Sequence, residues 1–398
     1  MIILKRRIHG EILQSIAVIG GGSLGTLIAL RLSNLGMNVE IFESKSELLR
    51  GASNLGEGKI HLGFTYGLSL RASYENLIES ALNFGEIIED SLRTTIDWEN
   101  ITSIPFTYTV DQNSLISPDQ FISHAMNIEK IIKEKKNQQT YLGTPVGNIA
   151  KLIRTSERSF LTTERAVDLE KLRSMVINEI VKRENIKVYL NSEISTIKIV
   201  NSSKYVLKSK ITPIEREFDY VINCSWDKRH ILDQQFFKNL SELNYRTKLY
   251  VSAQTNLREF ASTTILGKFG DLVIFKTGRL YASDYLTGLT SFTNSINPNF
   301  FERDSLPTDL VTKHWEYLKL RFSAEVPELS EIKDVVTLER TVVAQGDLDI
   351  DQINSGLHQR TPHYLARKGN YISALATKIT NVPQLSKKIV DWISSDGV

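Results

Sequence analysis

The sequence contains a single cysteine, Cys224, among its 398 residues. One thiol excludes an intramolecular disulfide, a multi-cysteine metal site and a CxxC redox pair, and it fits a reducing, cytoplasmic compartment. Charge of one sign is also scarce: 48 Lys and Arg face 46 Asp and Glu, for a net charge of +2. This balance argues against a nucleic-acid partner. No run of about 18 apolar residues is present, so we expect no membrane-spanning helix and no signal peptide.

The N-terminal part carries the pattern of a strand, a glycine-rich turn, a helix and a second strand. Its parts are Ser15–Ile19, Gly20-Gly21-Gly22-Ser23-Leu24-Gly25, a helix over 26–36 and a strand over 38–43. A buried parallel strand has such a continuous apolar run, and the whole is a βαβ unit. The length suggests two domains, possibly interleaved, and the hydrophobic content of 41% is enough to bury a large core.

The glycines and the acid of this unit have the spacing of a dinucleotide-binding motif. Gly20 permits the tight turn, Gly22 lets a pyrophosphate approach the backbone, and Gly25 lets the helix pack close to the strand. The helix N-terminus presents N–H groups to phosphate, and Ser23 and Leu24 of the turn are candidate cofactor contacts. Glu43 ends the second strand and can accept hydrogen bonds from ribose hydroxyls. The motif alone leaves NAD and FAD open.

A loop rich in glycine and serine follows and includes Gly58-Lys59-Ile60-His61-Leu62-Gly63. With this loop the sequence resembles the D-amino-acid oxidase family of FAD-dependent oxidoreductases. The loop itself is similar to that of L-2-hydroxyglutarate and glycerol-3-phosphate dehydrogenases. The resemblance implies FAD as cofactor, and it implies that Ser53, Gly58, Lys59, Ile60 and His61 lie along it.

Later segments extend the resemblance. The segment 162–168 resembles the entry to the second half of the FAD domain, and the strand after it implies that Ile194 or Glu193 lies against adenine. The segment 218–226 resembles a strand end near the phosphates, at Cys224, although Ser225 and Trp226 replace the family's small residues. The segment 369–383 resembles the last FAD segment. It implies that Lys378, Ile379 and Thr380 lie at the flavin, with Thr377 in place of a glycine.

The resemblance implies an α/β fold, in which a Rossmann-like FAD-binding domain of the glutathione-reductase type carries an interleaved antiparallel-sheet (α+β) substrate domain. We assign residues 11–75, 157–235 and 336–398 to the FAD-binding domain, and 76–156 and 236–335 to the substrate domain. Apolar periodicity predicts helices over 72–95, 120–136, 169–183 and 310–322. Alternation predicts strands over 247–255, 271–277 and 279–287, which would roof the flavin.

The candidate catalytic residues are His61, Arg340, Tyr250 and Tyr281. His61 is either a base that takes a proton near neutral pH or a histidine that hydrogen-bonds its own loop. The resemblance implies an arginine and a tyrosine for a substrate carboxylate. Arg340 is the first candidate, followed by Tyr250 and Tyr281 and, on the same strands, Arg279 and Tyr285.

The segment 345–360 is polar, with acids at Asp347, Asp349 and Asp351. It lacks the closing glutamate of an EF-hand, so a solvated loop with an Asp-capped turn is the alternative to a calcium site, and we predict no metal. His358 and Arg360 could instead point into the substrate pocket.

The resemblance implies an FAD-dependent oxidoreductase that removes a hydride from an amino-bearing carbon of a small carboxylate-containing substrate. Dioxygen or another acceptor would then take the electrons. A 2-hydroxy-acid dehydrogenase with His61 as base is the first alternative, and a non-catalytic FAD-binding scaffold is the second.

Overall fold

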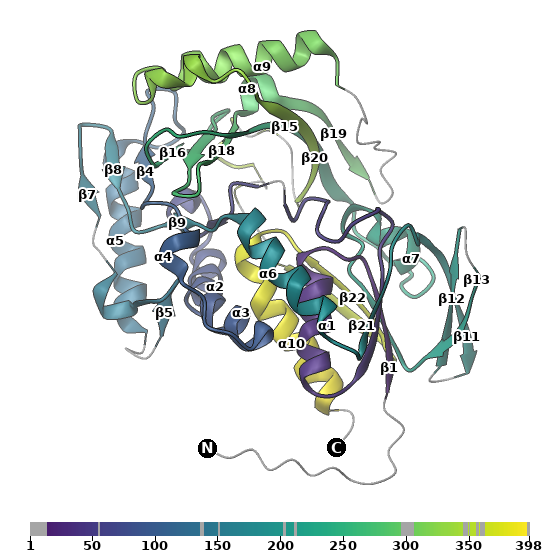
Figure 1. Cartoon of the computed structure of the whole chain (residues 1–398). Coiled ribbons are helices and arrows are strands. Elements are labelled where there is room, and N and C mark those ends of the chain that lie inside the picture. The colour runs from purple at the N-terminus through teal and green to yellow at the C-terminus, as the bar shows by residue number, and fades with distance from the viewer. Residues whose placement is uncertain are drawn as a thin grey trace.

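The computed structural model describes residues 14–54, 56–135, 139–149, 152–201, 204–210, 213–295, 306–344, 349, 351–355, 358 and 363–395. Figure 1 shows a lower half built on a parallel sheet with helices, and an upper half built on a large sheet beneath helix α9 (Thr308–Arg321). The chain passes between the halves several times, which is the interleaving that the sequence predicts.

The central sheet of the lower half has six strands in the order β10-β2-β1-β14-β22-β21. Their bounds are β10 Ile186–Tyr189, β2 Asn38–Phe42, β1 Ser15–Ile19, β14 Tyr220–Asn223, β22 Tyr371–Ala376 and β21 His363–Lys368. The first five strands pair in parallel, and β21 is antiparallel to β22. The predicted Rossmann-like α/β fold is thereby confirmed.

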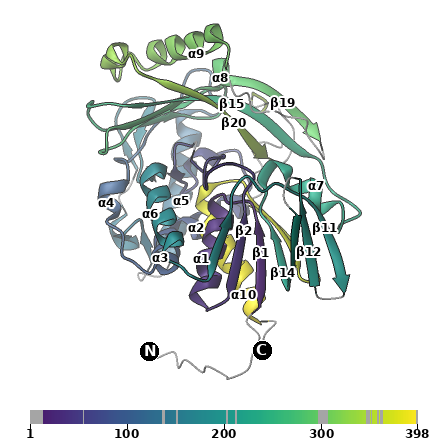
Figure 2. The same ribbon diagram turned by 45° about the vertical axis from the view of Figure 1, so that its right-hand side comes forward.

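A different layer covers each face of this sheet. Alternate side chains of β1 point to opposite faces, so they show which layer packs on which side. Ile16 and Val18 pack in the cluster that includes the helices α1 (Ser23–Asn34), α3 (Phe84–Leu92), α6 (Leu169–Val181) and α10 (Val382–Ser395). Ala17 and Ile19 pack in a second cluster on the other face. That cluster is formed with α7 (Arg229–Asp233) and a three-stranded antiparallel sheet of β11 (Ile194–Asn201), β12 (Lys204–Ser209) and β13 (Pro213–Phe218). Figure 2 shows this small sheet beside the central one.

The large sheet of the upper half has the strand order β19-β15-β18-β17-β16-β4-β8-β7, and β20 also pairs with β15. The bounds are β19 Leu289–Ser295, β15 Leu243–Gln254, β18 Arg279–Ser283, β17 Asp271–Ile274, β16 Phe260–Thr264, β4 Thr107–Thr109, β8 Ser159–Leu161, β7 Ile153–Arg154 and β20 Val336–Ala344. Helix α9 covers the outer face of this sheet, where its Trp315 and Leu318 pack with Val251 of β15 and Leu280 of β18. The inner face therefore looks towards the parallel sheet and roofs the space between the halves (Figure 1).

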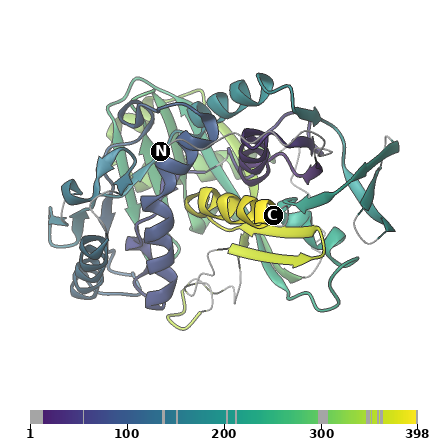
Figure 3. The ribbon, with the colours of Figure 1, turned by 90° about the horizontal axis from the view of Figure 1, so that it is seen from below.

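The remaining helices and short strands lie around the two sheets. They are β3 Lys59–Ile60, η1 Phe64–Tyr66, α2 Arg71–Leu82, α4 Trp98–Ile101, α5 Pro118–Glu134, β5 Thr140–Tyr141, β6 Thr144–Pro145, η2 Val146–Asn148, β9 Arg165–Ala166, η3 Trp226–Lys228, α8 Tyr285–Gly288, η4 Pro327–Glu331 and η6 Ile379–Asn381. Seen from below, α10 lies along β22, near the middle of the molecule (Figure 3). Across the described ranges, none of the helices combines the length and the apolar character that crossing a bilayer requires.

Several elements were predicted wrongly in extent: β15 begins at Leu243 rather than at 247, and β17 ends at Ile274 rather than at 277. Two further errors have a local cause. The expected helix over 72–95 is two helices, α2 and α3, because Asn83 ends the first: its side-chain Nδ2 and its backbone N–H both donate to the carbonyl of Glu79. A Cβ on Gly85 would lie 3.3 Å from the Trp98 ring, so a glycine there lets α3 pack closely. The expected strand over 279–287 ends at Ser283, because the Asp284 side chain accepts from the N–H of Leu286 and caps α8.

The boundaries between the halves also lie elsewhere than the sequence suggests. Strand β8 begins at Ser159, inside a range assigned to the FAD-binding domain, yet it pairs with β4 in the large sheet. Strand β20 spans 336–344, also assigned to the FAD-binding domain, and pairs along β15. Both strands complete the roof, so the chain returns to the parallel half later than predicted at each crossing.

Candidate active site

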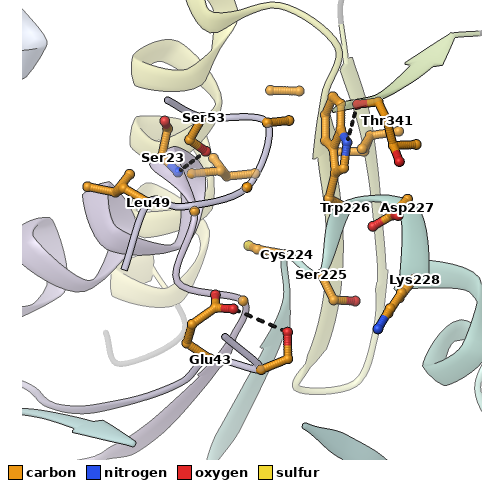
Figure 4. A pocket seen from close by; sticks show the side chains of 18 of the residues that line it. Ser23, Glu43, Leu49, Ser53, Cys224, Ser225, Trp226, Asp227, Lys228 and Thr341 are labelled. Carbon is orange, nitrogen blue, oxygen red and sulfur yellow. Dashed lines mark hydrogen bonds between the residues drawn. The ribbon is translucent and has the colours of Figure 1, made fainter. Parts of the chain in front are cut away.

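The glycine turn between β1 and α1 has the geometry that its residues predict. Gly20 has a φ of +101°, and a Cβ there would lie 2.6 Å from the carbonyl oxygen of Cys224. A Cβ on Gly25 would lie 2.0 Å from the carbonyl oxygen of Gly20, so only glycine lets α1 approach the strand. The Ser23 N–H donates to the Ser53 hydroxyl at 2.8 Å, which brings the predicted loop residue to the start of the helix (Figure 4).

A cavity of about 890 Å³ extends from this turn towards the roof. The predicted cofactor residues that line it are Gly20, Gly22, Ser23, Leu24, Glu43, Ser53, Gly58, Lys59, His61, Ile194, Cys224, Lys378 and Ile379, and the predicted Arg340 lines it too. The other predicted cofactor residues, Gly25, Ile60 and Thr380, are buried and do not line the cavity. A second cavity of about 150 Å³ adjoins the first beneath the roof and shares Lys59, His61, Arg340 and Lys378 with it.

The far end of the long cavity lies where β2 ends. The Glu43 carboxylate accepts from the N–H of Gly21 at 2.7 Å and from the N–H of Lys45 at 2.8 Å. The Ser192 N–H donates to the carbonyl of Glu43, which holds the segment from Asn191 to Ser195 beside the acid. The acid and the predicted adenine contact, Ile194, are therefore brought to one end of the cavity.

Cys224 and Trp226 form the side of the cavity opposite Ser53 (Figure 4). Burial raises the pKa of the Cys224 thiol well above its usual range, so it remains protonated. Trp226 has a left-handed φ of 53°, a conformation that favours glycine. Its indole N–H donates to the carbonyl of Thr341 at 3.3 Å, and its ring packs against the cluster that includes Val343 of β20 and Leu375 of β22. Trp226 thus joins the roof to the parallel half.

The pairing of β3 with β9 places His61 beside Glu164. The antiparallel register pairs Lys59 with Ala166 and Ile60 with Arg165, so the next positions along the two strands are His61 and Glu164. His61 Nδ1 lies 3.1 Å from Glu164 Oε1, and the His61 N–H donates to the Thr380 hydroxyl at 2.9 Å. Within the described residues, no hydrogen bond reaches His61 Nε2, and His61 lines both cavities.

The Glu164 carboxylate is fully buried and accepts three hydrogen bonds. Its donors are the Leu62 N–H at 2.6 Å, the Tyr108 hydroxyl, and His61 Nδ1. Burial opposes the ionisation of Glu164, but His61, Lys59 and the Tyr108 hydroxyl outweigh burial and lower its pKa. An ionised carboxylate only accepts, so His61 carries its proton on Nδ1 and leaves a lone pair on Nε2. Burial and the positive charge of Lys378 lower the pKa of His61 below its usual value, so the imidazole is neutral at pH 7.

Charged side chains surround the cavities where they meet. Lys59 is buried and its Nζ lies 2.8 Å from Asp271 Oδ1 and 4.2 Å from the centre of the Phe106 ring. Arg340 Nη2 lies 3.8 Å from Glu57 Oε2. Burial opposes the ionisation of Glu57, but Lys378, Arg340 and Lys59 together lower its pKa far below the usual range. The site therefore holds both signs of charge, with the cations in excess.

The predicted tyrosines contact Arg340 and do not line either cavity. The Arg340 Nη2 donates to the Tyr281 hydroxyl at 3.4 Å, and its guanidinium carbon lies 5.9 Å from the centre of the Tyr250 ring. Tyr250 and Tyr281 stack with ring centres 5.9 Å apart. Arg279 is a structural residue: it pairs with Asp168 at 3.3 Å, at the N-cap of α6. Tyr285, in contrast, lines the smaller cavity.

The acid-rich segment shows the turn that was the alternative to a calcium site. The Asp351 N–H donates to the Asp349 carboxylate at 3.0 Å, and Asp351 pairs with Lys268 at 2.6 Å. Among the described residues, no group of three or more His, Cys, Asp or Glu side chains could hold a metal ion. His358 lines the smaller cavity, whereas Asp347 and Arg360 lie outside the described residues.

Four residues of the site escaped sequence reasoning: Glu57, Glu164, Lys248 and Asp271. Glu164 lies in a segment that resembles the family, but nothing local marks it as the partner of His61. Its role follows from the register of two strands of two residues each, which is too short a pattern to read from sequence. Lys248 and Asp271 line the smaller cavity, on strands that were predicted only to form its roof.

The fold and the cavities together define a Rossmann-like nucleotide-binding protein with a roofed site. The family described as FAD dependent oxidoreductase (DAO) matches residues 15–338. No curated protein matches the chain. Similar solved structures include glycine oxidase from Geobacillus kaustophilus (TM-score 0.64, 15% identity, 96% of this chain and 94% of that chain). L-proline dehydrogenase from P. horikoshii is similar with a TM-score of 0.66 and 14% identity over 96% of this chain and 94% of that chain. L-alpha-glycerophosphate oxidase from Mycoplasma pneumoniae, with FAD bound, is similar with a TM-score of 0.65 and 12% identity over 96% of this chain and 94% of that chain.

The chain belongs to the DAO family of FAD-dependent oxidoreductases. It is therefore an enzyme whose cofactor is FAD. At these low identities the solved structures show the common fold and leave the substrate to be inferred from the site.

Proposed function

We propose that this enzyme oxidises a hydroxyl-bearing carbon of a small anionic substrate, with His61 as the base. The observation that carries this proposal is the buried contact between His61 Nδ1 and Glu164. An alcohol must lose its hydroxyl proton when its carbon loses a hydride, and a neutral imidazole near pH 7 is suited to take that proton. FAD, when bound, supplies the acceptor of the hydride.

The long cavity suits FAD. Its volume of about 890 Å³ lies within the usual range for ligand pockets. A Cβ on Gly22 would lie 3.0 Å from the Ser53 hydroxyl, so a side chain there would occupy the space next to the start of α1 that a pyrophosphate requires. We assign Gly20, Gly22, Ser23, Leu24 and Ser53 to the pyrophosphate.

The two ends of the cavity receive the other parts of the cofactor. Glu43 suits the ribose hydroxyls and Ile194 the adenine, while Cys224 packs beside the phosphates. The flavin ring is suited by residues of the long cavity near its contact with the smaller one: Lys59, His61 and Lys378, which line both cavities, and their neighbours Gly58 and Ile379. Ile60 and Thr380 support this end from behind, since Thr380 accepts the His61 N–H.

In this arrangement His61 Nε2 takes the hydroxyl proton. Glu164 keeps the Nδ1 proton in place and stabilises the positive charge that the imidazole then carries. The Tyr108 hydroxyl and the Leu62 N–H hold the Glu164 carboxylate, so the histidine ring has one orientation. Arg340, held by Tyr281 and Tyr250, provides the guanidinium for the anionic group of the substrate.

An amino-bearing substrate is the second candidate. It is favoured by the similarity to glycine oxidase and L-proline dehydrogenase, whose names state amino-acid substrates. A neutral amine can lose a hydride from its carbon without a strong base. In that case the His61–Glu164 pair would hold the loop, and Arg340 would still bind the carboxylate.

Anaerobic flavin reduction separates the two candidates. The purified holoenzyme is mixed with matched pairs of 2-hydroxy acids and 2-amino acids while flavin bleaching near about 450 nm is followed. We expect reduction by a hydroxy acid, and a loss of about 10²- to 10⁴-fold in its rate for His61→Asn with FAD retained. His363→Asn, on β21 at the edge of the central sheet, is the matched control. If an amino acid reduces the flavin of His61→Asn as fast as that of the wild type, the amino-bearing substrate is favoured. If no substrate reduces the flavin, the non-catalytic FAD-binding scaffold is favoured.

A further inference from the structure

Lys248 lies directly opposite Arg340 in the roof. The antiparallel register of β15 and β20 pairs Lys248 with Arg340. Directly opposite residues point to the same face of a sheet with Cβ atoms about 4.5–5.5 Å apart. Both side chains line the smaller cavity, next to His61. Like charges in directly opposite positions destabilise a sheet, so the stability of the fold does not explain why two cations stand here.

Two other cations of the site, Lys59 and Arg340, have anionic partners at short range, and Lys248 does not. Lys59 pairs with Asp271 at 2.8 Å, and Arg340 faces Glu57 at 3.8 Å. Within the described part of the chain, the Lys248 ammonium has no hydrogen bond and no carboxylate within ion-pair distance. Its one close partner is the ring of Tyr285, 3.8 Å from Nζ to the ring centre.

Lys248 is nevertheless only 4% exposed. A lysine that is buried to this degree loses the hydration of its ammonium, and an aromatic face replaces only part of it. An anion in the cavity would replace the rest. The cavity volume of about 150 Å³ admits a small anionic group and excludes a large one.

We propose that Lys248 and Arg340 together bind one oxyanion of the substrate, a carboxylate or a phosphate, on the roof side of His61. This inference deepens the proposed function, since it names the group that fixes the substrate. It places the anion on two cations from neighbouring strands, with Tyr285 against the lysine. The reacting carbon would then lie between this group and His61 Nε2.

Simple anions test the site without a known substrate. Oxidised holoenzyme is titrated with sodium acetate and, separately, with inorganic phosphate, while the visible spectrum of the flavin is recorded. We expect a saturable spectral change, and an increase in Kd of about 10- to 100-fold for Lys248→Met, as for the loss of a charged hydrogen-bond partner. Lys276→Met, on an exposed turn, is the matched control. The anion that binds more tightly identifies the group as carboxylate or phosphate.

Further measurements keep the proposal falsifiable. Because Lys248→Met removes a like-charge contact, its melting temperature should equal or exceed that of the wild type. If it falls, Lys248→Arg serves instead: anion binding retained in that variant supports the proposal, and anion binding lost overturns it. An unchanged Kd in a folded Lys248→Met also overturns it. The proposed function fails separately, when anions bind but no hydroxyl-bearing compound reduces the flavin.

Discussion

Replacing Glu164 by Gln tests the proposed base directly, because the amide keeps the shape and removes the charge. Three donors face the carboxylate: Leu62 N–H at Oε2, and His61 Nδ1 and the Tyr108 hydroxyl at Oε1. A backbone N–H can only donate, whereas a phenol and an imidazole can also accept. The Gln oxygen should therefore face Leu62, and the Gln amide group should face His61.

That orientation reverses the tautomer of His61. The amide N–H donates to Nδ1, so the imidazole proton moves to Nε2, which can no longer act as a base. Turning the amide round would leave two donors facing each other at Leu62, at a cost of about 1–3 kcal/mol, which favours the reversed tautomer by about 5- to 150-fold. The lost stabilisation of the imidazolium adds to this. We expect flavin reduction by the hydroxyl-bearing substrate to slow by about 10²- to 10⁴-fold.

Histidine tautomers can be observed without a substrate. In protein labelled with 15N-histidine, the wild-type His61 should show a protonated Nδ1 and an unprotonated Nε2, and Glu164→Gln should show the reverse. The His61→Asn variant identifies the signal among the 7 histidines. Glu164 raises the pKa of His61, against burial and Lys378, so the acid limb of the rate profile should move to lower pH in the variant. An unchanged tautomer together with an unchanged rate would refute the reasoning.

Three further predictions concern the turn, the acid stability and the junction. Gly25→Ala should cost about 3 kcal/mol or more of unfolding free energy and release FAD, because its Cβ has no space; thermal melts and bound-flavin absorbance check it, with Gly147→Ala as control. Burial and Lys248 lower the pKa of His314 to about 4, so the unfolded state binds its proton first as pH falls below 6.5. Between pH 7.5 and 4.5 the unfolding free energy should therefore fall by about 2.5 kcal/mol because of His314. In urea titrations, the fall measured for His314→Gln should be smaller than that of the wild type by this amount. Trp226 lines the cofactor cavity, so Trp226→Phe should remove more of the FAD-dependent quenching of tryptophan fluorescence than Trp392→Phe; equal losses would contradict this.

The parts of the fold that sequence reasoning predicted are those specified by local pattern. The strand, turn and helix from Ser15 to Asn34 follow from an apolar run and three glycines within one continuous segment. The acid at the end of β2 follows from the same spacing. Errors arose where a single polar residue ended an element, as Asn83 does between α2 and α3, or where a strand belongs to a sheet formed by distant segments, as β8 does.

The chemistry of the site depends on contacts between residues far apart in the sequence, and only one residue of each contacting pair could be predicted. His61 was a candidate, but Glu164 was not, since the register of β3 and β9 brings them together. Arg340 was a candidate, but Lys248 appeared only as part of a roof strand, since its meaning depends on the residue opposite it. Tyr250 and Tyr281 were expected to contact the substrate, and they contact Arg340 instead.

The contacts of His61 also bear on when the enzyme becomes active during its synthesis. Glu164 lies 103 residues further along the chain, and Thr380, which accepts the His61 N–H, lies 319 residues further. A growing chain completes its glycine turn early, but the proposed base gains its Thr380 contact only after the segment that follows β22 has been made. Contacts of such long range form slowly. We therefore expect that loss of the segment after β22 would remove the Thr380 contact of the proposed base and leave the first nucleotide-binding strands in place.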